Sequence, residues 1–98
     1  MLHIINKSPL ANSSLDSCLR VAQSGEILLT EDAVYAATSG NAFESKLAGA
    51  MGRLKVYVLQ PDLEARGLAD RIIAGVLPVD YGGFVDLVTN NKNCQSWL

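Results

Sequence analysis

The stretch LKVYVL at residues 54–59, followed by QPDLEARG at residues 60–67, decides the fold class. The first piece is a run of aliphatic and aromatic residues with a single charge, which is typical of a buried β-strand. The second has a proline near its start, an aspartate in its first turn and a glycine at its end, as short helices do. A strand that passes directly into a helix predicts one unit of an α/β sheet.

The sequence on both sides of this unit repeats the alternation. Apolar runs at residues 2–5 and 26–30 predict two further strands. A shorter run around Pro78 predicts a fourth strand at an edge of the sheet, because proline cannot donate to a central ladder. Helical patterns lie between and after these runs, with Gly25 expected to end the first helix and Asp80 to cap the last, and they cover residues 14–24, 32–38, 42–51 and 82–90. Residues 1–98 are therefore expected to form a single α/β domain with a mostly parallel sheet of four to five strands.

Composition and charge exclude several classes of function. The net charge is -2 with only eight basic residues, whereas direct binding of tRNA or DNA needs a clustered basic surface. No apolar run reaches the roughly 18 to 20 residues of a membrane span, and the start MLHIINKSP does not resemble a signal peptide. We therefore expect a cytoplasmic protein. Charged residues make up only 18% of the chain, so part of its apolar surface is expected to meet a partner subunit.

The sequence contains no recognisable catalytic, metal or cofactor motif. It has one histidine and no C-x-x-C pair, so no metal site is expected. The loops after the expected strands lack the glycine-rich patterns that bind phosphate, so no cofactor is expected either. An alternative function, that of a stand-alone flavodoxin-like domain binding a small ligand, is disfavoured by the same loops. The chain is not expected to be catalytic alone.

Several segments, taken in order, resemble the DsrH/TusB family of sulfur-relay proteins: LHIINKSP, SLDSCLRVAQSGEILLTEDAVYAA, KVYVLQPDLEARG, VDYGGFVDLVT and the final QSWL. The resemblance implies a flavodoxin-like (DsrE/F-like) three-layer sandwich. It also implies a small subunit of a cytoplasmic heterohexamer with two related α/β sulfur-relay subunits and a downstream sulfur-carrier protein of the DsrC/TusE type. The sulfur would end in 2-thiouridine of tRNA in TusB-like members, or pass through dissimilatory sulfur oxidation in DsrH-like members.

Cys18 is the candidate accessory sulfur acceptor, and two interpretations of it stay open. In the family's catalytic subunit the reactive cysteine is associated with a segment similar to residues 59–67, which here contains no sulfur. The resemblance places a cysteine in the first helix of some members, and Cys18 matches that position, so it is either a relay thiol at a subunit seam or a small core residue. It lies in an apolar stripe with Leu15 and Leu19, and a buried cysteine is inert.

Four further residues are candidates for a partner interface: Tyr35, Arg66, Trp97 and Leu98. Tyr35 follows an acidic pair at a helix start, and Arg66 closes the helix that follows the strand at residues 54–59. Trp97 and Leu98 end a polar segment without periodicity, so they are expected either to fold back or to dock on another chain. Cys94 is expected to be exposed on the same unstructured tail.

Overall fold

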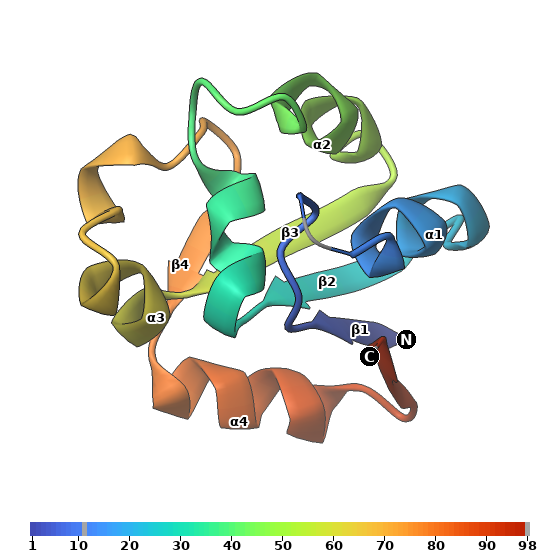
Figure 1. Ribbon diagram of the computed structural model, residues 1–98. Coiled ribbons are helices and arrows are strands. Elements are labelled where there is room, and N and C mark those ends of the chain that lie inside the picture. The colour runs from blue at the N-terminus through green and yellow to red at the C-terminus, as the bar shows by residue number, and fades with distance from the viewer. Residues whose placement is uncertain (11, 98) are drawn as a thin grey trace.

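The computed structural model describes residues 1–10 and 12–97 and consists of one five-stranded parallel sheet with helices on both faces (Figure 1). The strand order is β4-β3-β2-β1-β5. The strands are β1 (Leu2–Ile5), β2 (Gly25–Leu29), β3 (Leu54–Leu59), β4 (Leu77–Val79) and β5 (Cys94–Trp97). The helices are α1 (Ser14–Val21), α2 (Glu44–Ala50), α3 (Gln60–Ala65) and α4 (Tyr81–Asn90), with the 3-10 helices η1 (Glu31–Ala37) and η2 (Ala69–Arg71).

The two faces of the sheet are covered unequally. The larger core packs α1, η1, α2 and α3 against one face, through residues such as Ile27, Val56 and Leu63. The opposite face is covered by α4, where Leu87 packs with Leu2 and Leu28. Two helical layers around a parallel sheet confirm the expected three-layer α/β sandwich.

The strands and helices formed by local pattern lie where the sequence predicts them. β1 and β3 have the expected bounds, and β4, with Pro78 at its centre, is an edge strand. The Asp80 carboxylate accepts from the Gly83 N–H at 2.7 Å, which caps α4 as expected. Residues 31–37 are helical but wound as a 3-10 helix, with an i→i+3 bond from Ala33 N–H to the Thr30 carbonyl.

Gly25 does not end the first helix, which stops at Val21, and it opens β2 instead. Its φ of +114° favours glycine, and a Cβ here would lie 2.5 Å from the Met1 carbonyl oxygen. That carbonyl accepts from the Glu26 N–H at 3.1 Å. The glycine therefore serves the close approach of the chain start to β2.

The expected unstructured tail is wrong, because residues 94–97 form β5. This strand pairs in parallel with β1, from Leu2 opposite Cys94 to Ile5 opposite Trp97. Its first three side chains are exposed, so no alternation of apolar and polar residues marks it in the sequence. β5 is held by its backbone pairing with β1, which lies about ninety positions earlier in the chain. A local sequence pattern does not reveal such a distant partner.

Candidate functional site

The carboxyl ends of the parallel strands meet at one edge of the sheet, where α/β proteins gather their reactive groups. Gln60 occupies the turn from β3 into α3 and is exposed. This is the segment that corresponds to the catalytic subunit's cysteine segment in the resemblance. A glutamine amide is neither a nucleophile nor a sulfur acceptor, so the Gln60 side chain cannot take up sulfur at this position.

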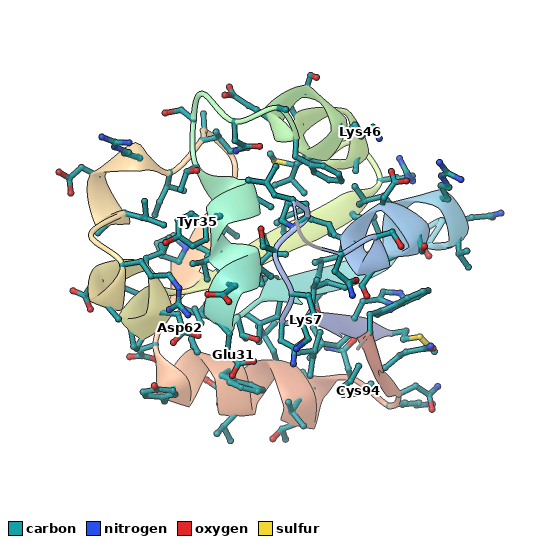
Figure 2. All side chains as sticks on the ribbon, in the orientation of Figure 1. Lys7, Glu31, Tyr35, Lys46, Asp62 and Cys94 are labelled. Atoms are coloured by element: carbon teal, nitrogen blue, oxygen red, sulfur yellow. The ribbon has the colours of Figure 1, made fainter. Side chains whose placement is uncertain are left out.

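Two acidic side chains at this edge, Asp32 and Asp62, are engaged in structural bonds. The Asp62 carboxylate accepts from the backbone N–H of Glu31 at 2.6 Å, which holds Glu31 at a φ of +50°. Arg66 forms an ion pair with Asp32 at 2.9 Å and also donates to the Asp62 carbonyl at 3.1 Å. Figure 2 shows Glu31 and Asp62 on neighbouring elements at this edge. These bonds tie the start of η1 to α3, and they give Arg66 a structural partner within the chain.

Tyr35 lies on the outer side of η1 with 40% of its surface exposed. Its backbone carbonyl accepts from the Thr38 hydroxyl at 2.7 Å, while its ring remains at the surface of the molecule (Figure 2). The structure therefore leaves Tyr35 available as an interface residue.

Cys18 lies in the larger core and has no exposed surface. Leu15 and Leu19 of the same helix are buried in the same cluster, as the helical spacing predicts. Burial raises the pKa of the Cys18 thiol from 9.0 to about 11. Only the thiolate of a cysteine attacks a persulfide. Because Cys18 is buried, both the ionisation of its thiol and the access of a persulfide to it are suppressed in this chain. This geometry supports the packing interpretation of Cys18.

Trp97 folds back onto β1. Its indole Nε1–H donates to His3 Nδ1 at 3.1 Å, and its ring packs at the border of the larger core. His3 is buried, and burial together with the N-terminal amino group lowers its pKa from 6.5. Leu98 lies outside the described residues. Of the two expectations for this end of the chain, fold-back is the one observed for Trp97.

A surface that the sequence analysis missed lies on the outer side of α4. Tyr81, Val85 and Val88 are 61%, 62% and 40% exposed, and we call these three residues the α4 surface. With Phe84 and Thr89 they line an almost wholly apolar hollow of about 250 Å³. The i, i+4, i+7 spacing of the three residues is the sequence signal for it, since Phe84 and Leu87 already supply the inward face.

A larger hollow of about 550 Å³ lies beside the start of α1 and the segment that leads into α2. Its polar wall includes Lys46, whose ammonium group lies 3.0 Å from the Asp16 carboxylate and 5.3 Å from the centre of the Phe43 ring. The charged groups of this wall are therefore paired with each other, and we assign no ligand to it.

Within residues 1–10 and 12–97, no three His, Cys, Asp or Glu side chains gather in a way that could hold a metal ion. None of the helices in the same described ranges is long and apolar enough to cross a membrane.

Comparison with known proteins gives a consistent assignment. The sequence model described as "DsrH like protein" matches residues 7–94. "Protein TusB" of Escherichia coli O1:K1 / APEC is 36% identical over 97 residues, which is 99% of this chain and 100% of that protein. "Protein TusB" of Shigella flexneri is 35% identical over the same shares. The crystal structure of ychN protein from E. coli superposes with a TM-score of 0.78 over 97% of both chains, and at 17% identity it supports the fold alone. Because the family match and the relatives span almost the whole chain, the chain belongs to the DsrH/TusB family.

Proposed function

We propose that this chain is an accessory, non-catalytic subunit of a cytoplasmic sulfur-relay complex, in which persulfide sulfur passes between other proteins. The observation that carries the proposal is that neither cysteine of the chain places an accessible thiol at the carboxyl ends of the central strands. The turn from β3 into α3 presents Gln60, and Cys18 is fully buried with a pKa of about 11. Cys94 is exposed but lies on the edge strand β5, away from the η1 and α3 residues at the carboxyl end of β3. Within residues 1–10 and 12–97, the strand ends therefore present neither an accessible thiol nor an acid-base set that would activate one.

The α4 surface supports the role of a partner subunit. Three large apolar side chains on one helix face are costly to leave in water, and they provide an apolar centre around which polar contacts can form. We infer that this surface meets one of two related α/β sulfur-relay subunits in a heterohexamer. A downstream sulfur-carrier protein of the DsrC/TusE type would then dock on the assembly rather than on this chain alone.

The relatives favour one branch of the family. The matched proteins named TusB cover 99% of this chain at 35–36% identity. We therefore propose 2-thiolation of the tRNA wobble uridine as the destination of the sulfur, rather than dissimilatory sulfur oxidation. With a net charge of -2, the subunit would act on proteins of the relay and leave tRNA binding to others.

Reconstitution tests this proposal. The chain is co-expressed with its two related subunits, the native mass is measured, and transfer of ³⁵S-labelled persulfide to the carrier is followed. We expect a stable complex in which Cys18→Ala and Cys94→Ser leave the rate of transfer unchanged, while omission of this chain lowers it. A Cys18→Ala complex of normal mass that no longer transfers sulfur would contradict the non-catalytic role and establish Cys18 as a relay thiol.

A further inference from the structure

The two edges of the sheet differ in their capacity to accept another strand. β4 has three residues, and the central one, Pro78, has no N–H to offer. β5 has four residues, Cys94–Trp97, without a proline or a charge. Proteins commonly protect an exposed edge with charged residues, proline or a covering element. β5 contains neither a charged residue nor a proline, and the side chains of Cys94, Gln95 and Ser96 are exposed.

The register with β1 shows which backbone groups of β5 point outward. The Leu2 N–H donates to the Asn93 carbonyl at 3.0 Å, while Leu2 lies opposite Cys94. In a parallel ladder this arrangement directs the backbone groups of residues 93, 95 and 97 toward β1. The N–H and C=O groups of Cys94 and Ser96 therefore point away from the sheet. β5 is an edge strand, so no other strand of the described sheet lies on that side to bond them.

We propose that two copies of this chain pair through β5 in antiparallel fashion about a two-fold axis that passes beside Gln95. In this register Cys94 of one copy lies opposite Ser96 of the other, so all four outward groups of each strand are bonded. The two five-stranded sheets become one continuous sheet. This inference concerns the backbone edge and does not depend on the proposed sulfur relay.

Two observations favour a second copy over another occupant. Because the edge is uncharged, two identical edges meet without like-charge repulsion. Because β4 is short and interrupted by Pro78, a β5-to-β4 contact is disfavoured, and the pairing closes after two copies instead of growing into a fibre. An extended segment of a different protein on the same edge is the competing outcome of the test.

Charge reversal at residue 95 tests the pairing in the full-length chain. In the proposed register the two Gln95 side chains face each other, so Gln95→Lys alone or Gln95→Glu alone places like charges together. We expect each variant to raise the dimer dissociation constant about fivefold, and an equimolar mixture of the two to restore the dimer. Sedimentation velocity gives the masses. Gln23→Lys, the same change at an exposed residue of the α1–β2 loop, is the matched control and should leave the dimer intact.

A cross-link tests the register directly. Residues facing each other at a non-hydrogen-bonded antiparallel position have Cα atoms about 4.5 Å apart, within the reach of a disulfide. Gln95→Cys in a Cys94→Ser background should therefore form a covalent dimer on mild oxidation, whereas Gln23→Cys in that background should not. The proposal is overturned if the wild-type chain sediments as a single chain, if its dimer is indifferent to charge at residue 95, or if the mixture of charged variants fails to recover it. The last two results would point to association through another surface or another protein.

Discussion

Trp97 donates its indole Nε1–H to Nδ1 of His3 across 3.1 Å, and the two rings lie 6.0 Å apart with an interplanar angle of 46°. This contact adds a side-chain bond to the backbone ladder between β5 and β1. It also requires a neutral His3, because Nδ1 can accept a hydrogen bond only when it carries no proton.

Removing the indole donor should destabilise the fold. Trp97→Phe keeps an aromatic ring but leaves the buried Nδ1 of His3 without its donor, at a cost of about 1 to 3 kcal/mol in the free energy of unfolding. Urea denaturation measures the change. In a His3→Phe background the same substitution should cost less, and equal costs in both backgrounds would show that the hydrogen bond contributes nothing.

Acid should weaken the protein through His3. Burial lowers its pKa in the folded state from the ordinary 6.5, so the unfolded chain takes up the proton first as the pH falls. The associated stability is complete above pH 6.5 and is lost below it, toward the lower pKa of the folded state. His3 is the single histidine of the sequence, so His3→Gln should flatten the fall in unfolding free energy measured by denaturant titration between pH 7 and pH 5. An unchanged slope would assign the loss to other groups.

Alkali should weaken the protein through Cys18. Its pKa is raised from 9.0 to about 11 in the folded state, so the unfolded chain loses the thiol proton first as the pH rises. This contribution is complete below pH 9 and is lost as the pH rises through the folded value. At neutral pH, a thiol reagent should modify Cys94 rapidly and Cys18 only after the chain unfolds. Cys94→Ser provides the control, and rapid labelling of that variant would contradict the burial of Cys18.

A charge on the α4 surface should disturb assembly more than folding. Val85 is 62% exposed, so Val85→Glu should change the free energy of unfolding of the isolated chain by no more than about 0.5 kcal/mol. In the co-expressed complex, the same change should lower the native mass, because the glutamate would have to be buried without a partner. Asn90→Glu, also exposed on α4 but outside the α4 surface, is the control. Loss of the complex in both variants would mean that any added charge is harmful.

The sequence predicts those parts of the fold that local pattern determines. β3 follows from one apolar run, and the helix after it follows from Pro61, Asp62 and Gly67. The cap of α4 follows from the presence of an aspartate, Asp80, directly before the helix. β5 could not be found this way, because its first three side chains face solvent and its partner strand is distant in sequence. The same holds for the burial of Cys18, which depends on how α1 packs on the sheet. The apolar stripe through Leu15 and Leu19 shows which side of the helix is buried. It does not show whether that side packs within this chain or lies at a seam with a second chain.

The pairing of β5 with β1 also has a consequence for biosynthesis. β1 is synthesised before the other strands and β5 after them. The backbone edge of β1 that pairs with β5 therefore stays unpaired while the rest of the sheet can already form. During that interval the nascent chain offers a second vacant edge to any extended peptide nearby. Slow translation, or a shortage of chaperone, should therefore harm this protein most before β5 emerges, and a truncated product that lacks β5 should be the species that aggregates.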